Sequence, residues 1–255
     1  MTLSWMEVEV GGLGGFPVVH GAAPEAPEPV RPRDVQALWR EASVAWEAVR
    51  LVGAAPGLLG RRSGEGRTVV LVPGYKTSSR AMEPLRAMLA WRGHDARHWG
   101  LGLNEGDPEG DVERLMPLLE GIVEEVGQPV VMVGWSLGGV ISRECARERP
   151  DLVGQVVTFG TPTVGGPTYT LGAGGWSPEE RARIAAMIDE RDRETPIRVP
   201  VTAMFTRVDR IVAWPACLDR ASVDVEHVEV GSGHLGMVLD PDVWRVVVER
   251  VEGGG

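Results

Sequence analysis

Short apolar runs alternate with longer amphipathic segments between residues 67 and 251. Runs of this kind are typical of strands in a parallel sheet, because both of their faces are buried. The segments between them carry apolar residues at helical spacing and are long enough to cross from one parallel strand to the next. The alternation therefore predicts an α/β fold, with a mostly parallel sheet flanked by helices.

This region divides into six expected strands and four expected helices. Five of the expected strands are runs rich in valine and other apolar residues, at 67–74, 129–134, 153–160, 199–206 and 223–230. The sixth, at 94–100, is more polar and falls where the alternation with helices requires a strand. The helices lie between or after them, at 78–93, 111–127, 137–150 and 241–251.

A further helix is expected before the first of these strands. Residues 34–53 repeat apolar side chains at helical spacing, with Trp46 and Val49 on the stripe that should pack against the core. Asp34 is suited to cap the start of this helix, and Gly53 is suited to end it.

Residues 21–33 are dense in proline and alanine and show no hydrophobic period, which is typical of an extended arm. We therefore expect an N-terminal segment over 1–33 and one α/β domain over 34–255. A chain of 255 residues with 43% hydrophobic residues is long enough to bury one substantial core.

The amino-acid composition argues against some binding partners and cellular locations of the protein. A net charge of −10 disfavours nucleic acid, because binding to phosphates needs clustered Lys and Arg. Two cysteines, Cys145 and Cys217, are too few for a disulfide framework and suggest buried or free thiols in a reducing compartment. No secretory leader and no apolar run of about 18 residues is evident, so we expect a cytoplasmic protein without an integral membrane segment.

One insertion, over 163–198, interrupts the alternation. Its first part carries five glycines between residues 163 and 176. Ser177 and Glu180 then form a capping box that predicts the start of a helix. The apolar face of this helix needs something to cover, so the insertion is either a lid on glycine hinges or an ordinary packed surface helix.

The stretch VVMVGWSLGG, residues 130–139, is the strongest indication of chemistry. Gly134, Ser136 and Gly138 match G-x-S-x-G between a predicted strand and a predicted helix, the context in which this pattern marks a nucleophile. The tight turn lifts the serine hydroxyl to the start of the helix, where negative charge is stabilised. Alone, the pattern also fits a structural glycine turn.

A serine nucleophile requires a histidine base and an acid that orients it. His234 is the best candidate base because it follows the last predicted strand, at the edge that should carry Ser136. Asp209 follows the strand before that one and is the expected acid. The alternative for Asp209 is a role as a loop cap, or an ion pair with Arg207 or Arg210.

The other histidines fit less well. His20 lies beside the proline-rich arm, and His227 is expected on a strand face. His94 and His98 in HDARH resemble the zinc motif H-E-x-x-H, but that motif works on a helix and this segment is a predicted strand. No metal site is therefore expected.

Two backbone N–H groups are candidates for an oxyanion hole. One belongs to Leu137, the residue after the proposed nucleophile. The second is that of Tyr75, in the loop after the first central strand, where Gly74 allows the backbone to approach.

In these features the sequence resembles the α/β-hydrolase superfamily, in particular its esterase and lipase-like members. The resemblance covers residues 67–251 and rests on LVPGY, VGWSLGG, VDRIV and GSGHLGM. It implies an α/β-hydrolase fold with eight strands in full form, whereas residues 34–60 read as helix and residues 1–20 supply one further strand at most. Pro73 stands where many members have histidine before the glycine of the oxyanion loop.

The resemblance implies a serine hydrolase that cleaves carboxylic esters through an acyl-enzyme, with a small-molecule or lipid-like substrate and no cofactor. Trp135, Leu235 and Met237 would line an apolar acyl pocket, or else they are ordinary packing. Two alternatives remain. The same triad could serve an acyltransferase, thioesterase or amidase, or the fold could be a non-catalytic binding module.

Overall fold

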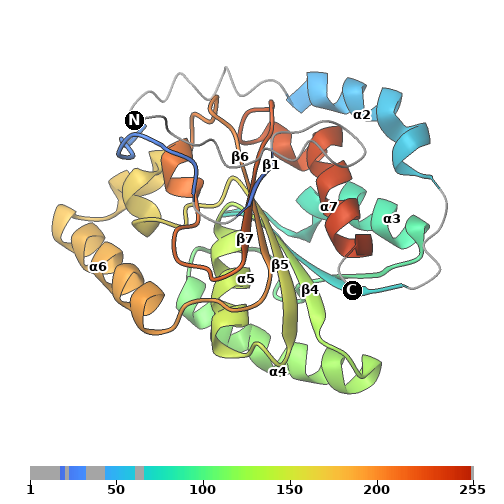
Figure 1. Ribbon diagram of the computed structural model, residues 1–255, viewed down its shortest axis with the longest axis horizontal. Coiled ribbons are helices and arrows are strands. Elements are labelled where there is room, and N and C mark those ends of the chain that lie inside the picture. The colour runs from blue at the N-terminus through green and yellow to red at the C-terminus, as the bar shows by residue number, and fades with distance from the viewer. Residues whose placement is uncertain (1–17, 21–22, 33–43, 61–65, 254–255) are drawn as a thin grey trace, which may run out of the picture.

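The computed structural model describes residues 18–20, 23–32, 44–60 and 66–253, and a twisted sheet lies at its centre (Figure 1). The described strands follow the order β1-β7-β6-β5-β4-β2-β3. Neighbours from β7 to β3 run parallel, and only β1 is antiparallel, paired with β7. The strands are β1 (Val18–His20), β2 (Thr68–Val72), β3 (Asp95–His98), β4 (Val130–Trp135), β5 (Val153–Phe159), β6 (Val201–Phe205) and β7 (Val225–Glu229). All six predicted strands are confirmed, and β1 adds one within residues 1–20.

Helices cover both faces of the sheet, with α4 and α5 on one side and α2, α3 and α7 on the other (Figure 1). The helices are α2 (Val44–Leu58), α3 (Glu83–Arg92), α4 (Pro108–Val126), α5 (Leu137–Glu148), α6 (Pro178–Glu194) and α7 (Pro241–Gly253). Short 3₁₀ helices are η1 (Ser79–Met82), η2 (Gly166–Tyr169), η3 (Leu171–Gly175), η4 (Trp214–Cys217) and η5 (Gly236–Leu239). The four helices predicted after residue 66 are therefore confirmed.

The burial of β2 explains its unbroken apolar sequence. Val69 and Leu71 point into the core beneath α3 and α7, whereas Val70 and Val72 point into the core beneath α4 and α5. Successive side chains of a strand face opposite sides, so a strand covered on both sides needs an apolar residue at every position. This is why the alternation identifies the fold.

Local signals set the ends of the helices around the sheet. Asp107 accepts a hydrogen bond from the Gly110 N–H at 3.2 Å and so caps α4, while Gly127 ends it at a φ of 74°. Gly93 ends α3 in the same left-handed conformation, at a φ of 102°. Glycine reaches this region without the steric cost that other residues incur.

The predicted helix over 34–53 is correct in type and wrong in two details. Residues 33–43 lie outside the described residues, so the cap at Asp34 stays a prediction. The helix does not end at Gly53, because α2 continues to Leu58. A single glycine costs a helix only about 1 kcal/mol, which packing of Ala54 and Leu58 on the core cluster offsets.

The face of α2 that packs is also different from the predicted one. Trp46 and Val49 are 63% and 62% exposed, whereas Glu47 is buried. Arg50 explains this orientation, because its guanidinium lies 2.6 Å from Glu47, 2.6 Å from Asp242 in α7 and 3.4 Å from Asp240 just before α7. Apolar spacing shows which residues share a face, and these ion pairs turn a different face inward.

The described part of the predicted arm, 23–32, contains neither helix nor strand. Ala23 and Ala26 pack against a small apolar cluster that includes Phe205 and Leu218, beyond the end of β6. The arm therefore lies against the domain over at least part of its length.

The insertion between β5 and β6 contains η2, η3 and α6. Its capping box is present, since Ser177 accepts from the Glu180 N–H and Glu180 accepts from the Ser177 N–H. Arg147 of α5 donates to Asp192 and to the carbonyl oxygens of Arg191 and Thr195, so the end of α6 is fastened to α5. Whether the glycine-rich part closes over Ser136 as a lid stays a prediction.

Both cysteines are buried and free, as the sequence predicts, and burial raises the pKa of each thiol. Within the described ranges, no helix combines the length and the apolar character that a bilayer span requires.

His227 lies on β7 as predicted and has no exposed surface. Its Nε2 lies 3.0 Å from the Asp219 carbonyl oxygen, a distance at which the ring N–H donates to that oxygen. Burial, and to a smaller extent the nearby Arg143 charge, lowers the pKa of His227 from 6.5 to about 4.

This depressed pKa predicts a loss of stability in acid. Between pH 6.5 and pH 4 the unfolded chain binds a proton at this histidine that the folded protein excludes. The contribution of His227 to the free energy of unfolding should be present above pH 6.5 and be lost, by about 3 kcal/mol, as the pH falls towards 4. Urea denaturation of the wild type and of His227→Gln, which keeps an N–H donor for Asp219, measures this. Equal pH slopes for the two proteins would contradict the assignment.

Candidate active site

Ser136 occupies the sharp turn between β4 and α5, with a φ of 54° and a ψ of −121°. Within the described residues, only Ser136 and Lys76 have a positive φ without being glycine. Such a conformation costs of order 1–3 kcal/mol and persists where the surrounding structure imposes it. The turn places the serine at the start of α5, whose unbonded N–H groups point towards it.

The glycines around Ser136 are required by close packing. A Cβ at Gly134 would lie 2.4 Å from the Cα of Gly139, and a Cβ at Gly138 would lie 2.2 Å from the Val72 carbonyl oxygen. Both contacts are with backbone, which cannot move aside as a flexible side chain can. The G-x-S-x-G spacing therefore arises because the turn packs so closely against β2 and α5 that only glycine fits at these two positions.

The structure brings together all three residues predicted as a triad. The Nε2 of His234 lies 3.1 Å from the Ser136 Oγ, and its Nδ1 lies 2.7 Å from the Asp209 Oδ2. Asp209 and His234 are buried, and Ser136 is half-buried. A carboxylate oxygen can only accept a hydrogen bond, so the Nδ1 that faces Asp209 must carry the proton of the neutral imidazole. The unprotonated Nε2 is then the acceptor for the serine hydroxyl.

Asp209 contacts His234 through one carboxylate oxygen and makes the contacts of the loop-capping alternative through the other. Its Oδ1 accepts hydrogen bonds from the Ile211 and Val212 N–H groups, at 2.8 Å and 2.7 Å. Arg207 instead pairs with Glu229, at 3.0 Å. The two backbone bonds hold the carboxylate so that its other oxygen faces His234.

Strand topology explains how residues so distant in sequence meet. Ser136 follows β4, Asp209 follows β6 and His234 follows β7. Parallel strands all end at one edge of the sheet, so the loops after them converge there.

The predicted oxyanion donors flank the serine. Leu137 is the first residue of α5, so its N–H has no acceptor within the helix. A Cβ at Gly74 would lie 3.3 Å from the Cβ of Ser136, so the loop that carries Tyr75 presses against the turn. Over the described residues, the Tyr75 N–H donates to no backbone oxygen.

The predicted pocket residues lie in or against the apolar core. Trp135 and Met237 are buried, and Leu235 packs on the same cluster. The Trp135 ring lies 5.9 Å from the His234 ring and so forms part of its support. A contribution of these three residues to an acyl pocket stays a prediction.

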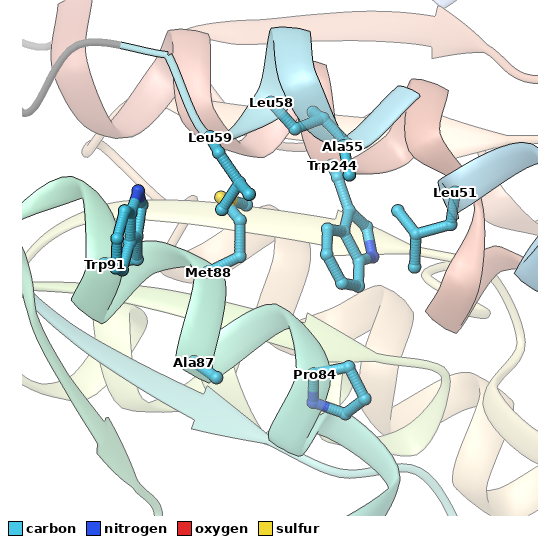
Figure 2. Close-up of a pocket in the computed structure, with 9 residues that line it drawn as sticks. All are labelled: Leu51, Ala55, Leu58, Leu59, Pro84, Ala87, Met88, Trp91 and Trp244. Carbon is cyan, nitrogen blue, oxygen red and sulfur yellow. The ribbon is translucent and has the colours of Figure 1, made fainter. Parts of the chain in front are cut away.

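A separate cleft of about 360 Å³ lies between α2, α3 and α7 (Figure 2). Trp244 projects between the two other helices, with Met88 beside it and Leu51 and Leu58 across from α3 (Figure 2). Every residue that lines it is apolar, and no triad residue does. It offers no group for acyl transfer.

The zinc-like HDARH segment forms β3 and the residue before it, not a helix. The Nδ1 of buried His94 accepts from the Arg67 N–H at 3.2 Å, and His98 pairs with Glu83 at 3.0 Å. In the part of the chain that the structure describes, no three His, Cys, Asp or Glu side chains are grouped to hold a metal ion.

Two residues near the site were not predicted. Gly160, at the end of β5, has a φ of 60°, and a Cβ there would lie 2.9 Å from the Nδ1 of His234. Asn104 is completely buried beside the loop of Tyr75. The sequence does show Gly160 directly after a predicted central strand, which is a sign of a constrained position at that edge of the sheet. Asn104 is distinguished in the sequence only by being the single asparagine of the chain.

Comparison with known proteins places the fold. No protein-family model matches the chain. A curated relative, the pimeloyl-(acyl-carrier protein) methyl ester esterase of Shewanella woodyi, is 30% identical over 98 residues. This match covers 38% of the chain and only 36% of the length of that protein.

Solved structures match over most of the chain. An esterase from Pyrococcus furiosus has a TM-score of 0.55 at 15% identity, covering 75% of this chain and 84% of that one. A monoacylglycerol lipase from Paleococcus ferrophilus has a TM-score of 0.54 at 18% identity, covering 77% and 97%. The type II thioesterase BorB of the borrelidin cluster has a TM-score of 0.53 at 19% identity, covering 76% and 94%. At these identities the likeness shows the fold, and the chain has the α/β-hydrolase fold that its sequence predicts.

Proposed function

We propose that this protein is a serine hydrolase that cleaves carboxylic esters through an acyl-enzyme on Ser136. The observation that carries the proposal is the continuous hydrogen-bonded chain from Ser136 through His234 to Asp209. A serine hydroxyl is unreactive at neutral pH unless a base accepts its proton. In this hydrogen-bonded arrangement His234 is the base, and Asp209 orients it.

The proposed reaction has two halves. His234 Nε2 takes the proton of Ser136 as the serine oxygen bonds to the ester carbonyl carbon, and the Leu137 and Tyr75 N–H groups face the oxyanion that forms. The intermediate collapses as His234 returns the proton to the departing alcohol, leaving an acyl-serine. Water then adds in the same way, with His234 as base, and the free acid leaves as Ser136 regains its proton.

The similar proteins support an ester or a thioester as substrate. Their names are esterase, lipase and thioesterase, which share attack on an acyl carbonyl. We propose a small-molecule or lipid-like oxygen ester, and the thioester is the second candidate because of the likeness to BorB. Matched oxygen esters and thioesters of one acyl group separate the two by their kcat/KM ratio.

A fluorophosphonate probe tests the nucleophile directly, because it phosphonylates a serine that an adjacent base activates. The wild type should be labelled and hydrolyse p-nitrophenyl esters from C2 to C16 with a preferred chain length, while Ser136→Ala should do neither. Ser177→Ala, at the remote cap of α6, is the matched control and should behave as wild type. An unlabelled wild type, or equal labelling of Ser136→Ala, would overturn the proposal.

A further inference from the structure

We infer that Asn104 is a positioning residue that fixes the backbone of residues 73–77, so that the Tyr75 N–H faces the oxyanion. The inference rests on the proposed function and adds to it a residue from a loop that carries no triad member. Asn104 lies in the connection between β3 and α4, and its side chain has no exposed surface.

The loop over 73–77 is not held by its own turn alone. Thr77 donates to the Gly74 carbonyl oxygen through its N–H at 3.1 Å and its hydroxyl at 2.7 Å. Lys76, however, has a φ of 54°, a left-handed conformation that is unfavourable for a residue with a side chain. Contacts from outside the loop must therefore maintain this shape.

Asn104 supplies those contacts on both sides of Tyr75. Its Nδ2 donates to the Pro73 carbonyl oxygen at 2.8 Å. Its backbone carbonyl oxygen accepts from the Lys76 N–H at 2.8 Å, and its backbone N–H donates to the Thr77 carbonyl oxygen at 2.9 Å. Three hydrogen bonds from one residue thus bracket the peptide unit whose N–H is the proposed oxyanion donor.

The side chain of Asn104 is in turn held by its own loop. Its Oδ1 accepts from the Gly106 N–H at 3.1 Å, which directs the Nδ2 towards Pro73. Gly106 also leaves room for the Tyr75 ring, since a Cβ there would lie 2.5 Å from the Tyr75 Cε2. Beside it, Lys76 forms an ion pair with Glu105.

The opposite side of the loop is set by the serine turn itself. Gly74 packs against Ser136 and Trp135, so its backbone cannot move towards the nucleophile. Asn104 prevents movement away from it. A hydrogen bond weakens steeply once its donor–hydrogen–acceptor angle falls below about 120°, so a strongly rotated Tyr75 peptide would be a poor donor to the oxyanion.

Substitution of Asn104 should therefore act on kcat. In Asn104→Ala the donor to Pro73 is lost. In Asn104→Asp a carboxylate oxygen replaces that donor and opposes the Pro73 carbonyl. We expect kcat for a p-nitrophenyl ester to fall roughly 10- to 30-fold in each, with KM changed less than about twofold, because the loop contacts the transition state more than the bound ester. Glu113→Gln, which changes an exposed side chain of α4 and none of the contacts of the loop over 73–77, is the control and should stay within about twofold of wild type.

A pH profile separates positioning from general loosening. Once protonated, the buried carboxyl of Asn104→Asp regains an O–H that donates to Pro73, so its kcat relative to wild type should rise as pH falls from 8 to 5. The ratio for Asn104→Ala should stay flat. Amide hydrogen exchange over 73–77 should be faster in Asn104→Ala than in wild type.

The outcomes distinguish the two proposals. If wild type hydrolyses esters through Ser136 but both Asn104 variants keep their kcat, or both pH ratios are flat, the positioning role is wrong and the serine hydrolase stands. If wild type shows no hydrolysis that depends on Ser136, both are overturned.

Discussion

Replacing Asp209 with asparagine should lower kcat for an ester about 10⁴-fold while the fold survives. The Oδ1 of Asp209 accepts two backbone N–H groups, so the oxygen of the new amide is required on that side. The NH₂ group must then face the Nδ1 of His234, which becomes the acceptor. The proton moves to Nε2, and the imidazole can no longer accept the proton of Ser136.

Steady-state kinetics with a p-nitrophenyl ester, together with the rate of fluorophosphonate labelling, measures this loss. Asp224→Asn makes the same chemical change on an exposed residue before β7 and should leave both rates unchanged. Thermal unfolding checks that the fold is retained. A kcat within tenfold of wild type for Asp209→Asn would mean that another group orients His234.

Gly160→Ala should reduce kcat/KM at least about 100-fold, because it displaces His234, the proposed base, and leaves the imidazole itself unchanged. The new Cβ would lie 2.9 Å from the Nδ1 and 3.0 Å from the Cε1 of His234, and 3.2 Å from the Sδ of Met237. These atoms are buried, so the imidazole must move, and it can do so only by lengthening its bonds to Asp209 or Ser136. The φ of 60° at this position adds strain for alanine.

Gly231→Ala is the matched control for this change. It lies three residues before His234, yet a Cβ there would meet nothing within 4 Å. Kinetics of the two variants against wild type, with unfolding temperatures measured beside them, separates displacement of the base from loss of stability. Comparable kcat/KM values for Gly160→Ala and Gly231→Ala would contradict the steric argument.

The sheet and the meeting of Ser136, Asp209 and His234 could be predicted because each strand, and the serine turn, leaves its own mark in the nearby sequence. A strand buried on both faces must be apolar throughout, so β2, β4 and β5 are visible in the sequence itself. A serine between a strand and a helix restricts its neighbours to glycine. Once Ser136 is placed, parallel topology leaves few positions for an acid and a base, and Asp209 and His234 occupy two of them.

Features that depend on contacts between distant segments could not be predicted. The inward face of α2 is decided by Arg50 and the acids beside α7, which no periodicity within α2 can reveal. The role of Asn104 depends on carbonyl oxygens some thirty positions earlier. The sequence shows Gly160 directly after a central strand, but the clash that requires glycine there is with His234, in the loop after another strand.

Lys76 provides the only side-chain amine of the protein, and it lies next to the candidate active site. It is the only lysine among the 26 Lys and Arg residues, and its side chain is half exposed. Reagents that acylate or alkylate amines, which usually attach to many sites at once, have this residue as their one side-chain target. A dye, spin label or resin that couples to amines would therefore attach at the loop beside Ser136 and, apart from that loop, only at the α-amino group of the chain. Such a label would report on the loop, and immobilisation by the same chemistry would fasten the protein there.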